Sequence, residues 1–132
     1  MMPLAYLVTL VVFVAIDLVW LGVVAHGYYR ERIGALLLAE PQLGAAAAFY
    51  LLYAAGVVYF AVMPGLDAGS PMKAAQQGAV LGFIAYATYD LTNLATLKGW
   101  SLSLAVVDMA WGTVLTGAVA AITVWALGLV AR

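Results

Sequence analysis

Long runs of apolar residues separated by short polar stretches dominate this sequence. Four runs stand out, at residues 3–25, 44–63, 72–95 and 102–130. Each is near or above the ~20 residues with which a helix crosses ~30 Å of hydrocarbon. The pattern therefore predicts an all-α fold, a polytopic membrane protein whose single domain is an up-and-down bundle of four transmembrane helices.

The first run differs from a secretory signal peptide. It lacks a positively charged start, exceeds the usual length of a signal's apolar core, and contains Asp17. We expect it to be retained as the first helix of the bundle.

The stretches between the runs have the composition of connections. "HGYYRERIGALLLAEPQ" follows the first run, "PGLDAGSP" has turn chemistry, and "TLKGWS" is a short polar link with glycine. In the first connection, apolar residues recur at near-helical spacing beside two arginines, which fits either a helix in the membrane interface or an ordinary ordered loop. These apolar residues are Tyr28, Tyr29, Ile33, Leu36 and Leu37.

Basic residues between the helices predict the orientation. Arg30, Arg32 and Lys98 lie on the side of the first and third connections, against Lys73 and Arg132 on the other side. Because cytoplasmic connections carry the excess of Lys and Arg, we expect the first and third connections in the cytoplasm and both termini outside it.

Three aspartates lie inside the apolar runs. With a rise of ~1.5 Å per residue, Asp90 is roughly 8 Å from the end of its helix, Asp108 roughly 9 Å and Asp17 roughly 12 Å. The helices alternate in direction, so all three depths are measured from the side of the first and third connections. We therefore expect the three carboxyl groups in one half of the bilayer.

Helical spacing gives each aspartate neighbours on its own helix. Trp20 follows Asp17 in "DLVWLG" as Trp111 follows Asp108 in "DMAWG", and Tyr86 and Asn93 flank Asp90. Tyr53 of the second run falls in the same half of the bundle. We predict a site for a ligand, a proton or a cation, formed by Asp17, Asp90, Asp108, Asn93, Tyr86, Tyr53, Trp20 and Trp111.

Such a layer has a functional and a structural interpretation. Ionisable groups at this depth mark pathways, relays or ligand sites, and two neighbouring acids favour a shared proton over full charges. Carboxylate, amide and phenol oxygens also suit a hard cation such as Na⁺, Mg²⁺ or Ca²⁺. Alternatively, the same groups only hydrogen-bond to one another and fix how the helices pack.

Small residues mark one face of the third run. Gly78 and Gly82 are four residues apart and lead through Tyr86 to Asp90. This GxxxG ridge predicts close helix contact, either inside the bundle or between subunits of a homo-oligomer. The fourth run has a comparable ridge through Gly112 and Thr116.

Composition confirms the membrane class and excludes several functions. Of 132 residues, 67% are hydrophobic and 8% charged, whereas a soluble domain has about 25% charged residues. The net charge of −1 excludes a basic nucleic-acid surface. With no cysteine and one histidine, His26, the chain has no thiol nucleophile and no zinc site of the usual kinds. The sequence identifies no cofactor, and a metal is left open.

The ordered motifs resemble a family of short bacterial membrane proteins classed as a domain of unknown function. They are "DLVWLG", "YYRERIG", "FYLLYAAGVVYFAV", "YATYDLTNLATLKGW" and "VDMAWG", of which "TYDLTNLATLKGW" is the most specific. The resemblance spans nearly the whole chain. It implies a four-helix protein of a prokaryotic inner membrane and brings no activity, cofactor or catalytic residue.

Three function classes follow. The first is a small ligand-binding protein or transporter with proton or cation coupling, similar in size to the small multidrug transporters, although those use a glutamate in the first helix. The second is a membrane enzyme that acts on a lipid or isoprenoid, with paired carboxylates as acid and base. The third is an accessory or assembly subunit whose polar layer is structural.

Overall fold

The structure, a computed structural model, describes residues 2–24, 26–34 and 42–130. All its elements are helical, and π-helical turns, labelled η, interrupt two of the long helices. In chain order they are α1 (Met2–Val19), η1 (Trp20–Val24), α2 (His26–Ile33), α3 (Leu43–Val57), η3 (Val58–Val62), α4 (Met63–Ala68), α5 (Pro71–Thr96) and α6 (Leu102–Val130).

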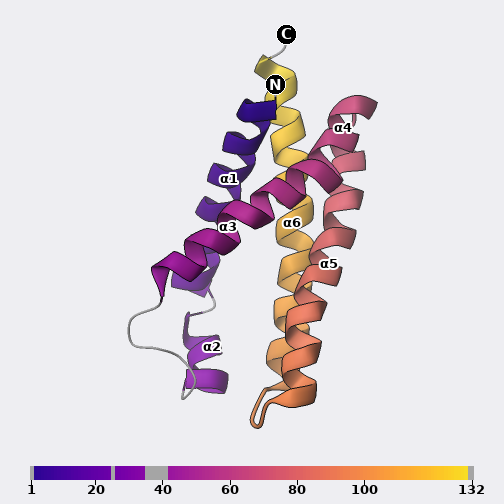
Figure 1. The fold of residues 1–132 in the computed structure, drawn as a ribbon. Coiled ribbons are helices and arrows are strands. Elements are labelled where there is room, and N and C mark those ends of the chain that lie inside the picture. Colours follow the sequence, from indigo (N-terminus) through magenta and orange to yellow (C-terminus); the bar gives the residue numbers. More distant parts are fainter. Residues whose placement is uncertain (1, 25, 35–41, 131–132) are drawn as a thin grey trace.

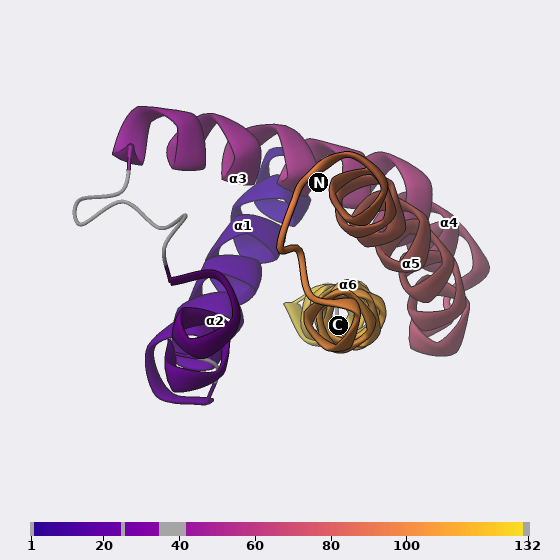
Figure 2. The ribbon, with the colours of Figure 1, turned by 90° about the horizontal axis from the view of Figure 1, so that it is seen from below.

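The long helices alternate in direction (Figure 1). The beginning of α1 and the end of α6 lie together at one end of the molecule, which we call the terminal end. The connection between α5 and α6 lies at the opposite end, as does α2, and we call this the turn end. Seen from the turn end, α6 lies between α1 on one side and α5 on the other, and α3 runs along the upper edge of the view (Figure 2).

Three helical segments are long and apolar enough to cross a membrane, namely Met2–Val23, Leu43–Ala68 and Leu102–Val130. The predicted third span, α5, has 26 residues but carries more polar side chains, including Lys73, Gln76 and Gln77. The all-helical membrane fold is therefore established, whereas the count of four spans stays a prediction.

The predicted turn after the second helix is wrong over most of its length. Met63–Ala68 is helical and includes Pro64 and Gly65, so the second helix runs five residues beyond its predicted end at residue 63. Proline is tolerated here because it stands at the start of α4, directly after the π-helical turn η3. The reversal itself needs only Gly69, at φ 61°, and Ser70, whose hydroxyl accepts from the backbone N–H of Lys73 and caps α5.

The predicted glycine ridge packs inside the chain. A side chain at Gly78 would meet the backbone of α6 at Thr116 and Gly117, and one at Gly82 would collide with the carbonyl oxygen of Gly112. The absence of side chains here lets α5 and α6 approach closely along their length. Of the two interpretations of the ridge, the structure therefore shows the internal one.

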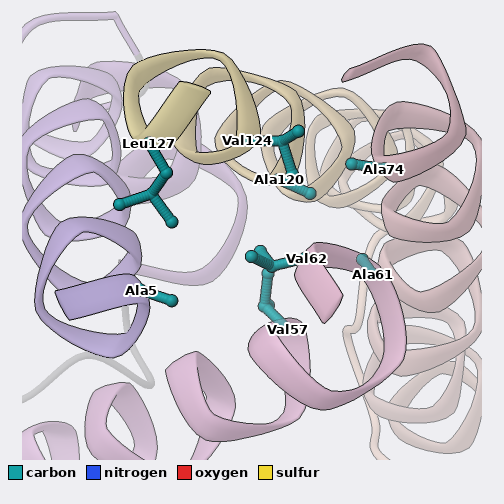
Figure 3. Close-up of a cluster of buried hydrophobic side chains, with 8 residues drawn as sticks. All are labelled: Ala5, Val57, Ala61, Val62, Ala74, Ala120, Val124 and Leu127. Atoms are coloured by element: carbon teal, nitrogen blue, oxygen red, sulfur yellow. The ribbon is translucent and has the colours of Figure 1, made fainter. Parts of the chain in front are cut away.

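Small side chains also fill the terminal end. Its buried cluster combines residues from α1, α3, η3, α5 and α6, which turn toward a common centre (Figure 3): Ala5, Val57, Ala61, Val62, Ala74, Ala120, Val124 and Leu127. One polar pair is buried on the same side, where the hydroxyl of Thr9 donates to that of Thr123 at 3.3 Å. Apolar packing and paired hydroxyls close this end of the bundle.

The first connection contains the short helix α2, which agrees with the helical spacing of its apolar residues. Tyr28 and Tyr29 lie on this helix, and Tyr28 is hydrogen-bonded to the hydroxyl of Ser103 at the start of α6. This contact holds α2 against the turn end of the bundle. Leu36 and Leu37 of the same prediction lie outside the described residues, as does residue 25 at the predicted end of the first helix.

Candidate functional site

A cavity of about 430 Å³ lies in the half of the bundle next to the turn end. Residues of α1, η1, α2, α3, α5, α6 and the link between α5 and α6 form its wall. Six of the eight predicted site residues line it: Asp17, Asp90, Asp108, Tyr86, Trp20 and Trp111. Most of the remaining wall is aromatic or aliphatic, so the three carboxyl groups stand in apolar surroundings.

The two Asp-x-x-Trp motifs pair crosswise. Trp111 of α6 donates from Nε1 to Oδ1 of Asp17 on α1 at 3.2 Å. The indole rings of Trp20 and Trp111 stack with centroids 4.2 Å apart and planes 8° from parallel. The π-helical turn η1 begins at Trp20, so the regular helix changes geometry at the residue that makes this stack. Each tryptophan therefore contacts a residue of the opposite motif rather than the aspartate three residues before it.

Tyr29 completes the second half of this arrangement. Its hydroxyl accepts from Nε1 of Trp20 at 3.1 Å and donates to Oδ1 of Asp108 at 2.8 Å. Burial raises the pKa of Tyr29 well above its usual value, and the charge of nearby Asp108 acts in the same direction. The phenol is therefore neutral at physiological pH and remains a donor to Asp108.

Asp90 has quite different surroundings. It is fully buried, and neither carboxyl oxygen has a hydrogen-bond partner among the described residues. The neighbouring acid is Asp108, which lines the same cavity. An unpaired buried carboxylate costs several kcal/mol, so the geometry favours a proton held between Asp90 and Asp108.

The three acids therefore differ in the number of donors that reach them. Asp17 accepts two hydrogen bonds, from Trp111 and, at 2.7 Å, from the hydroxyl of Tyr50. Asp108 accepts one, from Tyr29, and Asp90 none within the described chain. The hydrogen-bonding needs of Asp17 are therefore met within the described chain, whereas those of Asp90 are left to a proton or a ligand.

Two predicted site residues do not line the cavity. Tyr53 exchanges a hydrogen bond of 2.8 Å with Thr116, toward the terminal end, and its ring meets Tyr86 edge-on at 6.3 Å between centroids. It therefore supports Tyr86 from behind. Asn93 is partly buried one turn beyond Asp90 and is absent from the wall.

The predicted set of site residues omits Tyr29, Tyr50 and Trp100. Tyr29 and Trp100 have the positions typical of an aromatic belt at the membrane interface. Instead both line the cavity, and Nε1 of Trp100 is buried without an acceptor in the described chain. For Tyr50 the signal was its spacing of three residues from Tyr53, which places both on one side of α3.

The cavity offers no compact metal site. Among the described residues, no three His, Cys, Asp or Glu side chains come together as a set of metal ligands. The chemistry that the arrangement does offer is exchange of a proton or a positive charge between closely spaced carboxyl groups beside stacked aromatic rings.

Comparisons with known proteins agree with the membrane fold. No curated protein and no solved structure matches the chain. The family described as "Predicted membrane protein (DUF2177)" matches residues 2–125. This match covers nearly the whole described bundle, including both Asp-x-x-Trp motifs and the cavity between them. The chain therefore belongs to the DUF2177 family of predicted membrane proteins.

Proposed function

We propose that the protein binds a small amphipathic cation in this cavity and releases a proton from the Asp90–Asp108 pair in exchange. The observation that carries the proposal is the buried Asp90, which has no hydrogen-bond partner in the described chain and lies beside Asp108. A proton neutralises this pair when the cavity is empty. A bound cation would do the same, so the two compete.

The rest of the wall suits the apolar part of such a ligand. Trp20, Trp111 and Tyr86 present aromatic surface next to the carboxyl groups. Aromatic faces attract cations, and this attraction grows when water is excluded. A volume of about 430 Å³ lies within the range of pockets for small organic molecules. The ligand class is therefore an organic ammonium with a flat or short apolar group.

Binding of a matched pair of probes tests the proposal. Phenylbutylammonium and uncharged phenylbutanol share their apolar part, and the fluorescence of Trp20 and Trp111 reports occupancy of the cavity. In nanodiscs, we expect the cation to bind at least about ten-fold more tightly than the alcohol, which corresponds to about 1.4 kcal/mol. In Asp90→Asn this preference should fall, because the amide cannot provide the negative charge that Asp90 offers to the cation after it has lost its proton.

Asp67→Asn is the matched control. It makes the same chemical change at an exposed acid of α4, near the terminal end and outside the cavity wall. The preference for the cation should persist in this variant. Equal binding of both probes to the natural protein would overturn the proposal, and so would an undiminished preference in folded Asp90→Asn.

Acid–base catalysis on a lipid or isoprenoid is a second candidate. It is favoured by the same pair, because Asp108 accepts a hydrogen bond from Tyr29 and Asp90 has no partner in the described chain, so the two carboxyl groups have different surroundings. Mass spectrometry distinguishes the two candidates. A binding protein returns its ligand chemically unchanged after incubation. An enzyme converts the ligand into a product, and this conversion depends on Asp90.

We further propose that α5 is the fourth span and that the turn end faces the cytoplasm. Its 26 residues correspond to about 39 Å of helix, and it packs along α6. Arg30, Arg32 and Lys98 lie at the turn end, which supports a cytoplasmic location. Reporter fusions at the C-terminus test this orientation, and a reporter active only in the cytoplasm would reverse it.

A further inference from the structure

The cavity has one side that none of the described helices closes. At the terminal end, α5 packs against η3 and α4, which continue the second helix. Toward the turn end, α3 instead lies against α1 and diverges from α5. Figures 1 and 2 show this divergence, with the beginning of α3 far from the end of α5. The two helices thus form a wedge that widens toward the level of the cavity.

Residues at this wedge line the cavity and also reach the outer surface. Phe49 of α3 is 46% exposed and Tyr89 of α5 is 55% exposed, and both belong to the cavity wall. None of the side chains of residues 42–53 is buried. This half of α3 is apolar and belongs to a segment that is able to span a membrane. In a bilayer, hydrocarbon therefore surrounds it on several sides.

We infer that the cavity opens laterally into the bilayer between Phe49 and Tyr89, and that its ligand carries a hydrocarbon chain that lies in this wedge. The inference rests on the proposed function, because it specifies the apolar part of the same ligand. The ammonium group then lies among the carboxyl groups, and the chain extends past the aromatic rings of the wedge into lipid.

Other routes into the cavity are less well provided. The terminal end is closed by the buried cluster of small residues around Ala120 and by the tight contact at Gly82. At the turn end, α2 is held over the bundle by the hydrogen bonds of Tyr28 and Tyr29. Entry through the wedge does not require these hydrogen bonds to break, and the apolar wall of the wedge favours hydrocarbon over water.

Quenching of tryptophan fluorescence by brominated acyl chains tests the lateral opening. The chain has four tryptophans, so two reporters are made by changing the other three to Phe. One keeps Trp111 in the cavity wall, and the other keeps Trp125, which is 58% exposed on α6. In vesicles of brominated phosphatidylcholine, we expect Trp111 to be quenched at least half as efficiently as Trp125.

A pair of added phenyl groups locates the opening. In the Trp111 reporter, Ala85→Phe adds bulk to the cavity wall and should lower quenching several-fold, whereas Val80→Phe on the outer face of α5 should leave it unchanged. Circular dichroism and gel filtration confirm that each variant is folded. Equal quenching in the two variants would contradict entry through this wedge.

The remaining outcomes also decide the matter. Trp111 shielded from bromine but quenched by aqueous acrylamide would show access from water and overturn the inference. Shielding in a stable dimer would show that a second copy covers the wedge, which also overturns it. A protein that prefers the cation yet shields Trp111 refutes only the lateral entry. Conversely, one that admits brominated chains without preferring the cation refutes only the proposed function.

Discussion

The two ends of the bundle bury polar groups in opposite ways. At the terminal end, Thr9 and Thr123 form a neutral hydroxyl pair inside close packing of small residues. At the turn end, three carboxyl groups surround an open cavity, and Asp90 lacks a partner in the described chain. Hydroxyls satisfied by each other need nothing further. A carboxyl group left without a donor requires a proton or a ligand.

The contrast has a cause in side-chain size. Between the helices of the terminal end stand Gly, Ala, Val and Thr, which allow backbones to approach and leave little room. The turn end instead uses large rings that contact each other, as Trp20 and Trp111 do. Rings hold the helices apart while they stabilise the acids by hydrogen bonds. The packed end thus supplies rigidity, and the aromatic end supplies the site.

We expect the greatest loss of stability from a substitution at the packed end. Gly82→Ala places a methyl group against the carbonyl of Gly112 and the side chain of Thr116. Overpacking of this kind costs about 2–3 kcal/mol. Thermal unfolding in detergent measures the loss.

Gly56→Ala is its control, since no atom lies within 4 Å of the added methyl group. There the reduced flexibility of the unfolded chain should stabilise the protein by about 0.5–1 kcal/mol. Similar unfolding temperatures for the two variants would show that α5 and α6 are not in close contact at Gly82.

A smaller loss of stability is expected from a substitution at the aromatic end. Tyr29→Phe removes the donor to Asp108 and the acceptor for Trp20. Two partly buried groups then lack partners, which we expect to destabilise the protein by about 2 kcal/mol. Tyr59→Phe on the outer surface, where Tyr59 is 67% exposed, should change stability little. A Tyr29→Phe protein as stable as Tyr59→Phe would show that α2 does not stabilise the site through these hydrogen bonds.

The smallest changes in stability are expected at the buried hydroxyl pair of the terminal end. A double-mutant cycle at Thr9 and Thr123 measures how strongly the two hydroxyls are coupled. Each single change to Val leaves one buried hydroxyl unpaired and should cost about 1 kcal/mol. The double change replaces both by apolar groups of the same shape and should be nearly neutral. Additive losses would mean that these hydroxyls have further partners and are not a self-contained pair.

The helical fold and the level of the acids along the bundle could be predicted because both depend on distance along the chain. Apolar runs of about 20 residues define spans, and the rise per residue converts position into depth. Asp17, Asp90 and Asp108 consequently line one cavity. The helical continuation through Pro64 could not be predicted, since it depends on the π-helical turn that precedes it.

The partners of the acids could not be predicted, because they come from other elements. Spacing along one helix pairs Asp17 with Trp20, but the donors to Asp17 are Tyr50 of α3 and Trp111 of α6. Likewise Tyr29 donates to Asp108 although 79 positions separate the two residues in the sequence. Contacts of this kind depend on how the helices rotate and cross, and a single sequence carries no direct signal for that.

The number of protons released when the cation binds is the sharpest test of the proposed exchange. Calorimetric titration of phenylbutylammonium in two buffers with different ionisation enthalpies gives the number of protons released per bound cation. We predict about one proton for the natural protein and none for Asp90→Asn, because the cation replaces the proton shared by Asp90 and Asp108. Cation binding without any proton release, or release that persists in folded Asp90→Asn, would contradict the proposed exchange.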